Sequence, residues 1–208
     1  IQLIKKYLKK ALAAKEYSLL FNRNKNNPNG RVMTIAGSDS GGGAGIQADL
    51  KTITLLGSFG TSALTALTAQ NTLGVAETYQ VHTDFVVKQI ETILEDIGTD
   101  TVKTGMPSRG GIVIRDRSLL AVVDPVMVAK GGESLLDKEA NESLISRLLP
   151  ESYLLTPNLP EVAALTGIEP SNVDEMIEAG QNLQALGARN ILIKGGHLDG
   201  DAPATLMR

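Results

Sequence analysis

The chain has 208 residues, 42% hydrophobic residues and a net charge of -3 at pH 7, which fits one sizeable α/β domain and excludes the disordered and collagen-like classes. It contains no cysteine, so disulfides, thiolate metal sites and catalysis by a cysteine of this chain are excluded. Because no apolar run is long enough to cross a bilayer and the N-terminus lacks the pattern of a cleaved signal, we expect a cytoplasmic protein with no membrane partner.

The first segment, residues 1–30, differs in character from the rest. Ile4, Leu8 and Leu12 share one face of a predicted helix, lysines occupy the other face, and a linker rich in Asn follows as far as Gly30. A basic amphipathic helix of this kind suits contact with a membrane surface or nucleic acid, or simple packing in solvent. We favour an N-terminal extension or the remnant of a fused domain, with no nucleic-acid partner.

From residue 31 to 208 strand-like runs alternate with helix-like runs, which predicts one domain. The predicted strands are 31–37, 61–69, 100–105, 119–126, 152–157 and 190–196. Apolar residues at helical spacing predict helices over 84–97 and 172–188, the second capped by Asn172. Repeated strand-helix-strand order favours a mostly parallel sheet with helices on both faces.

A glycine-rich stretch, "TIAGSDSGGGAGIQADLKT", follows the first predicted strand. Gly37 and Gly42 have Walker A spacing, but Gly43 stands where that motif needs lysine. Gly43, Gly45 and Ala48 fit a Rossmann variant, but no acidic residue follows about 20 positions later to hold a ribose. A plain tight turn from strand to helix is the third alternative.

Polar residues around the glycines favour a ligand site over a plain turn. Asp39 lies in the loop, and Gln47 and Asp49 lie in the first turns of the next helix. Ligands of open parallel sheets bind beyond the carboxyl ends of the strands, and a loop poor in side chains lets main-chain groups approach a flat or anionic molecule. The residues therefore predict a small-ligand site and leave the ligand open.

Other predicted strand ends carry further candidates. Gln70 and Asn71 bear amides that suit a ring nitrogen and an exocyclic amine, or they are simply a polar strand end. Met106 either floors a pocket for an aromatic ring or packs in the core. Asp124 ends an apolar strand, where a carboxylate needs a cation or a hydrogen-bond donor.

Two candidates suit phosphate and metal chemistry. Asn158 and Glu161 lie three residues apart at a strand-to-helix junction, where they either orient water on Mg²⁺ or form a capping box, and the two interpretations have equal weight. Lys194 precedes two glycines at the end of the last predicted strand. A cation beside a flexible loop suits phosphate oxygens, although surface lysines are usually only solvated.

With these motifs in order, the chain resembles the hydroxymethylpyrimidine and phosphomethylpyrimidine kinases of thiamine biosynthesis, in the ribokinase-like superfamily. The resemblance extends over about residues 32–201, and it depends on the glycine loop with "IQADLKT", on "VVDPVM", on "TPNLPEVAALTG" and on "ILIKGG". Pyridoxal kinases of the same superfamily share most of these motifs. Gln70, in "TAQNT", favours the pyrimidine enzymes.

The resemblance implies a ribokinase-like three-layer α/β/α fold, a homodimer, and ATP-dependent phosphorylation of the hydroxymethyl group followed by a second transfer to the monophosphate. It implies Mg²⁺ as cofactor, with Asp124 and Glu161 as its ligands and with Asn158, Glu161 and Lys194 near the ATP phosphates. It implies a substrate pocket formed by Gly37, Ala44, Asp49, Gln70 and Met106.

The sequence departs from the family pattern in two places. The Gly-Thr-Gly segment with its Cys or Asp base should follow shortly after Lys194, but the chain stops at Arg208, so we assign no catalytic base. A non-catalytic pyrimidine-binding domain therefore stays an alternative. The stretch between Met106 and Asp124 is also several residues short of the expected helix.

Overall fold

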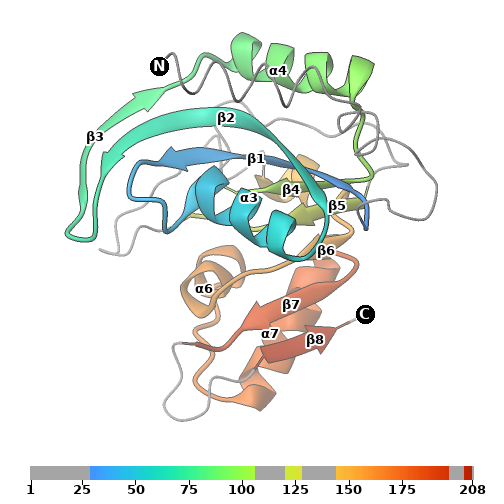
Figure 1. The fold of residues 1–208 in the computed structure, drawn as a ribbon. Helices are drawn as coiled ribbons and strands as arrows, with labels where there is room; N and C mark the ends of the chain where they lie inside the picture. The colour runs from blue at the N-terminus through green and yellow to red at the C-terminus, as the bar shows by residue number, and fades with distance from the viewer. Residues whose placement is uncertain (1–28, 106–119, 128–143, 197–203, 208) are drawn as a thin grey trace, which may run out of the picture.

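The computed structural model describes residues 29–105, 120–127, 144–196 and 204–207 (Figure 1). The predicted N-terminal helix lies outside the described residues. The same holds for Met106 and for most of the short stretch that follows it.

The described residues form one eight-stranded sheet with the order β3-β2-β1-β4-β5-β6-β7-β8. The strands are β1 Arg31–Asp39, β2 Phe59–Gln70, β3 Val75–Gln80, β4 Thr101–Thr104, β5 Leu120–Val123, β6 Leu154–Leu155, β7 Ile191–Lys194 and β8 Ala204–Met207. Six strands, β2, β1, β4, β5, β6 and β7, are paired in parallel, and β3 and β8 add antiparallel edges. All six predicted strands are confirmed, whereas β3 and β8 were not predicted.

The helices connect these strands. They are α3 Gly45–Leu55, α4 Thr83–Asp96, α6 Leu159–Thr166 and α7 Val173–Ala185, with a short π-helical turn, η1, at Leu144–Leu148. The predicted cap of α7 is present, since the Asn172 side chain accepts a hydrogen bond from the Glu175 amide. In the described part of the chain, no helix combines the length and apolar character that a bilayer crossing requires.

Helices cover both faces of the sheet. Paired residues of parallel strands point to the same face, and the register aligns Ile35 with Thr104 of β4 and then Val123 of β5. Ile35 packs with Val86 of α4 on that face. Thr34, which points the opposite way, donates its hydroxyl proton to a side chain of α3. Figure 1 accordingly shows α4 and α3 on opposite sides of β1 and β2, which confirms the predicted three-layer architecture.

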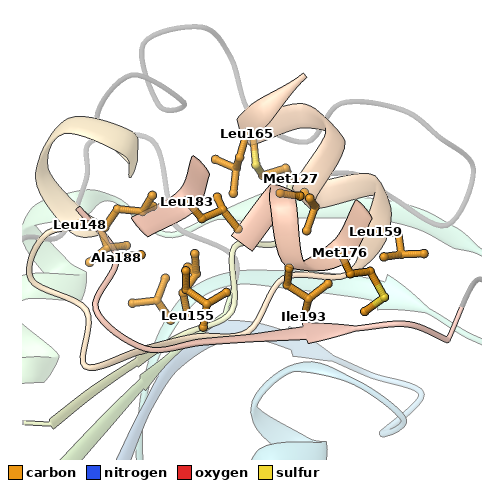
Figure 2. Packing of buried hydrophobic residues seen from close by; sticks show 14 residues of the cluster. Met127, Leu148, Leu155, Leu159, Leu165, Met176, Leu183, Ala188 and Ile193 are labelled. Atoms are coloured by element: carbon orange, nitrogen blue, oxygen red, sulfur yellow. The ribbon is translucent and has the colours of Figure 1, made fainter. Parts of the chain in front are cut away.

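A large apolar cluster holds the second half of the sheet against α6 and α7 (Figure 2). Leu155, Met176 and Leu183 lie at its centre and are fully buried, together with Ile193 of β7. Burial of such side chains contributes about 1.5–3 kcal/mol each relative to exposure. The cluster therefore fixes the carboxyl ends of β5, β6 and β7 against the start of α6, where several candidate site residues lie.

Candidate functional site

The glycine loop between β1 and α3 folds around the carboxylate of Asp39. One carboxylate oxygen accepts the Gly41 amide proton at 2.7 Å, and the other accepts those of Gly43 at 2.9 Å and Ala44 at 2.8 Å. The Asp39 side chain is buried, so these three bonds supply the partners that water would otherwise supply. Asp39 is thus the internal anchor of the loop.

The charge of Asp39 follows from the same contacts. Burial by itself raises the pKa of a carboxyl group, but the surrounding backbone N–H donors outweigh it and hold the pKa of Asp39 below its ordinary value. The carboxylate therefore stays ionised at neutral pH and engages the amides that a phosphate would otherwise use. In particular, the N–H of Ala44, a predicted pocket residue, is already bound to Asp39.

Glycine is required where the loop enters α3. Gly45 has a φ of +54°, and a Cβ atom on it would lie 2.2 Å from the carbonyl oxygen of Gly37. No side chain fits at that distance, so the loop closes tightly over the end of β1. The two glycines place main chain, without side chains, at the carboxyl edge of the sheet.

The first turns of α3 fasten the loop further. Gln47 accepts the amide proton of Asp39 at 2.9 Å and donates to the Ser38 hydroxyl at 2.7 Å. Lys51 donates to the Gly42 carbonyl at 2.7 Å. Gln47, which the sequence placed in the ligand set, therefore serves the loop itself.

The loop is also joined to the end of β2, where Gln70 lies. The Ser40 hydroxyl accepts the Gln70 amide proton at 2.7 Å and donates to the Gln70 carbonyl, also at 2.7 Å. The Gln70 side chain lies within hydrogen-bond reach of the Thr68 hydroxyl. The structure thus brings the glycine loop and Gln70 together. Asn71, in contrast, accepts amide protons from Leu73 and Gly74 and serves the turn to β3.

Asp49, in α3, forms an ion pair with Lys103 of β4. Its carboxylate accepts a hydrogen bond from the Lys103 ammonium group at 2.9 Å and another from the Thr34 hydroxyl. Both partners lie on the sheet face that α3 covers, so the pair joins α3 to β1 and β4. Met106, which the resemblance placed in the same pocket, lies outside the described residues.

A second polar group lies where β5 and β7 end and α6 begins. The Lys194 ammonium group donates a hydrogen bond to the Asp124 carboxylate at 2.8 Å. Lys194 is thus the cation that a carboxylate at the end of this apolar strand was predicted to need. At the start of α6 the Asn158 side chain accepts the Glu161 amide proton at 2.9 Å, and the Glu161 carboxylate accepts that of Asn158 at 2.7 Å. Asn158 and Glu161 therefore form the capping box, which was one of the two interpretations of this pair.

Glu161 is the most buried carboxylate of this group, with 2% of its surface exposed. Burial raises its pKa and the nearby charge of Asp124 adds to the rise, while the Asn158 amide and the charge of Lys194 act against it. Asp124, Glu161 and Lys194 therefore form one electrostatic unit at the carboxyl end of the sheet.

Comparison with known proteins identifies the family and the fold of the chain. The family model described as phosphomethylpyrimidine kinase matches residues 39–207. The chain belongs to the phosphomethylpyrimidine kinase family. This confirms the resemblance seen in the motifs and, with it, the ribokinase-like fold.

Members of the family in other organisms are closely similar. The thiamine biosynthesis bifunctional protein ThiED of Geobacter sulfurreducens is 54% identical over 195 residues, which cover 90% of this chain and 40% of that protein. The hydroxymethylpyrimidine/phosphomethylpyrimidine kinase of Escherichia coli is 47% identical over 176 residues, covering 81% of this chain and 66% of that protein. The chain thus spans less than two thirds of the length of these curated relatives.

Solved structures agree with the sequence comparison. A phosphomethylpyrimidine kinase from Clostridium difficile has a TM-score of 0.76 and 47% identity, covering 85% of this chain and 80% of that one. A pyridoxal kinase from Staphylococcus aureus in complex with ADP has a TM-score of 0.75 and 38% identity, covering 85% and 68%. The same fold is therefore found in kinases named for phosphomethylpyrimidine and in kinases named for pyridoxal.

Two contributors to the site in this family member, Ser40 and Thr68, were not recognised from the sequence. Asp39 was assigned to the polar set of a ligand site, but its role as the anchor of the loop was not recognised. Asp39 followed by Ser-Gly is typical of an aspartate that binds the backbone two residues on. Ser40 follows it directly. Thr68 precedes Gln70 by two residues, so the alternation of a strand places both side chains on one face.

We expect the two carboxylates that cap α6 and α7 to affect stability in opposite ways with pH. The raised pKa of Glu161 means that the folded state binds more protons than the unfolded chain just above about pH 4.3, so the free energy of unfolding falls as pH rises through that window. Glu161→Gln keeps the capping geometry and removes this loss, so the variant should gain stability relative to the wild type as pH rises. Thermal unfolding between pH 4 and 7 measures the difference.

Glu175 is the matched control, because it holds the same position in α7. Hydrogen bonds from the amide and the hydroxyl of Ser171 lower its pKa, so its contribution is present above the ordinary carboxyl pKa and is lost as pH falls. Glu175→Gln should therefore lose stability relative to the wild type at neutral pH. Parallel pH curves for the two variants would contradict this account of Glu161.

Proposed function

We propose that this protein phosphorylates 4-amino-5-hydroxymethyl-2-methylpyrimidine and then its monophosphate with ATP, as a step of thiamine biosynthesis. The observation that carries the proposal is the position of Gln70, whose main chain is bonded to the Ser40 hydroxyl so that the residue lies beside the glycine-rich loop. A flat heteroaromatic alcohol fits such a wall, and an amide suits its amino-substituted edge. The names of the relatives support the same activity.

The loop supports the substrate half of the site better than the ATP half. It lacks the Walker lysine, and Asp39 binds the amide protons of Gly41, Gly43 and Ala44. A loop whose amides already bind a carboxylate repels a phosphate more than it attracts one. We therefore assign to the loop the role of shaping the pocket for the pyrimidine ring.

We assign the phosphates of ATP to the second group of residues. Solved pyridoxal kinases of similar fold hold ADP or AMP-PCP, which supports a nucleotide site in this architecture. The ammonium group of Lys194 would meet phosphate oxygens, and Asn158 and Glu161 fix the start of α6 beside it. Transfer of a phosphoryl group needs positioning and charge stabilisation more than covalent chemistry.

The residues present also fit Mg²⁺. In the described part of the chain no group of three or more His, Cys, Asp or Glu could enclose a metal, and Mg²⁺ ordinarily uses one or two carboxylates, with waters and substrate phosphates as the other ligands. Asp124 would hold the ion directly, and the buried carboxylate of Glu161 would do so through water. When bound, Mg²⁺ neutralises charge on the phosphate oxygens.

The family assignment also supports a proposal about the location, oligomeric state and partners of the protein. We propose that the protein acts in the cytoplasm as a homodimer on a small-molecule substrate, without nucleic-acid or membrane partners. Size-exclusion chromatography with light scattering tests the dimer, and a monomer at micromolar concentration would contradict it.

Titration calorimetry with the chain tests the substrate assignment. We expect the aminopyrimidine alcohol to bind at least about tenfold more tightly than pyridoxal, because only the former offers an amino group beside a ring nitrogen to Gln70. A coupled kinase assay on the complete gene product with Mg²⁺ and ATP then measures transfer. Tighter binding of pyridoxal would make the protein a vitamin B6 kinase, and pyrimidine binding without turnover would make it a binding domain.

A further inference from the structure

The hydroxyl of Thr68, two residues before the end of β2, lies between two acceptor oxygens. It is 2.9 Å from the carbonyl oxygen of Ser38 and 3.2 Å from Oε1 of Gln70. A hydroxyl group has one proton to donate, so it cannot donate to both oxygens. One of the two contacts must therefore have the opposite direction.

The chemistry of the Ser38 carbonyl shows in which of the two contacts the Thr68 hydroxyl is the acceptor. A carbonyl oxygen only accepts, and this contact is the shorter one, so the Thr68 proton belongs to Ser38. The Thr68 oxygen then offers a lone pair to Gln70. A half-turn about the last side-chain bond of Gln70 exchanges Oε1 with the amide nitrogen Nε2, and Nε2 then donates to Thr68.

We propose that Thr68 is a positioning residue that determines substrate specificity, because it fixes which atom of the Gln70 amide faces each part of the substrate. With Nε2 turned to Thr68, the outer edge presents Oε1 as an acceptor and the second Nε2 proton as a donor. That order complements an exocyclic amino group next to a ring nitrogen. The same order of acceptor and donor does not match a ring with an oxo group in place of the amino group and an N–H in place of the ring nitrogen, because acceptor would then face acceptor and donor would face donor. This inference rests on the proposed function.

The rest of the network keeps the amide in place for this role. Ser40 holds both backbone groups of Gln70, so the residue cannot slide along the strand. Within the described residues, Thr68 is the one side chain in hydrogen-bond contact with the Gln70 amide. The orientation of the amide therefore depends on a single hydroxyl.

The test compares two ligands on three proteins by titration calorimetry. The ligands are the 4-amino-5-hydroxymethylpyrimidine and its 4-oxo counterpart, and the proteins are the wild type, Thr68→Val and Thr68→Ser. Valine has nearly the shape of threonine but accepts no hydrogen bond from Nε2, whereas serine keeps the hydroxyl. We expect the ratio of the two dissociation constants to fall by about tenfold in Thr68→Val, as the loss of one hydrogen bond predicts, and to stay near the wild-type value in Thr68→Ser.

Each outcome has one meaning. A wild-type ratio retained in a folded Thr68→Val overturns the role of Thr68, and a ratio lost equally in Thr68→Ser does so as well. If the wild type binds neither ligand, the proposed function is wrong, and this inference, which rests on it, is wrong as well. Thermal melting checks the fold of each variant, and Thr68→Ala, which also lacks the hydroxyl, replaces Thr68→Val should valine prevent folding.

Discussion

Replacing Gly45 by alanine is expected to destabilise the protein by about 3 kcal/mol, a large effect for one methyl group. The residue lies in the left-handed region with φ +54°, which costs a residue with a side chain about 1–2 kcal/mol. The new Cβ would also lie 2.2 Å from the Gly37 carbonyl, a backbone atom that cannot turn aside. Denaturant unfolding measures the loss, and titration with the aminopyrimidine should show weaker binding.

Gly167→Ala is the matched control for this prediction. Gly167 caps the C-terminus of α6 with φ +75°, but nothing lies within 4 Å of a Cβ built there. The substitution carries the backbone cost alone, about 1 kcal/mol, and should leave pyrimidine binding unchanged. Equal losses in the two variants would show that the contact with Gly37 does not matter.

Replacing Gln70 by alanine is expected to weaken binding of the aminopyrimidine alcohol by about 10- to 100-fold, the equivalent of two lost hydrogen bonds. Stability should change little, because the bonds from Ser40 involve only the main chain of Gln70. Titration calorimetry measures the affinity, and circular dichroism during heating measures the stability.

Asn71→Ala provides the control with a neighbouring amide. The Asn71 side chain holds the turn into β3 through the amides of Leu73 and Gly74, so its removal should weaken the turn and leave the affinity almost unchanged. If both variants bind the pyrimidine as the wild type does, the amide of Gln70 has no role in recognition.

The interior of the sheet could be predicted from the sequence, but its edges could not. The strands β5, β6 and β7 lie in short, mainly apolar runs followed by turn residues, and such runs indicate buried strands. All six residues of β3 are exposed, so this strand carries no alternating pattern, and it forms because β2 offers a free edge. The edge strand β8 follows the last parallel strand and depends in the same way on a partner.

The candidate site was predictable in position but not in its pairings. The glycine loop and Gln70 indicated a ligand site at the carboxyl edge, and the structure joins the loop to Gln70 through Ser40. The ion pair of Asp124 with Lys194 joins residues 70 positions apart, and no local pattern specifies such a contact. The bond between Ser40 and Gln70, which lie 30 positions apart, could not be predicted for the same reason.

The anchored carboxylate of Asp39 has a consequence for the energetics of recognition. Because the protein supplies its own anion to the loop, the backbone there loses its conformational freedom when the chain folds and not when the ligand arrives. A substrate that meets a rigid wall sacrifices only its own freedom of movement. Discrimination between similar rings then depends on the match of donors and acceptors, since a stiff enclosure cannot remodel itself around the wrong one.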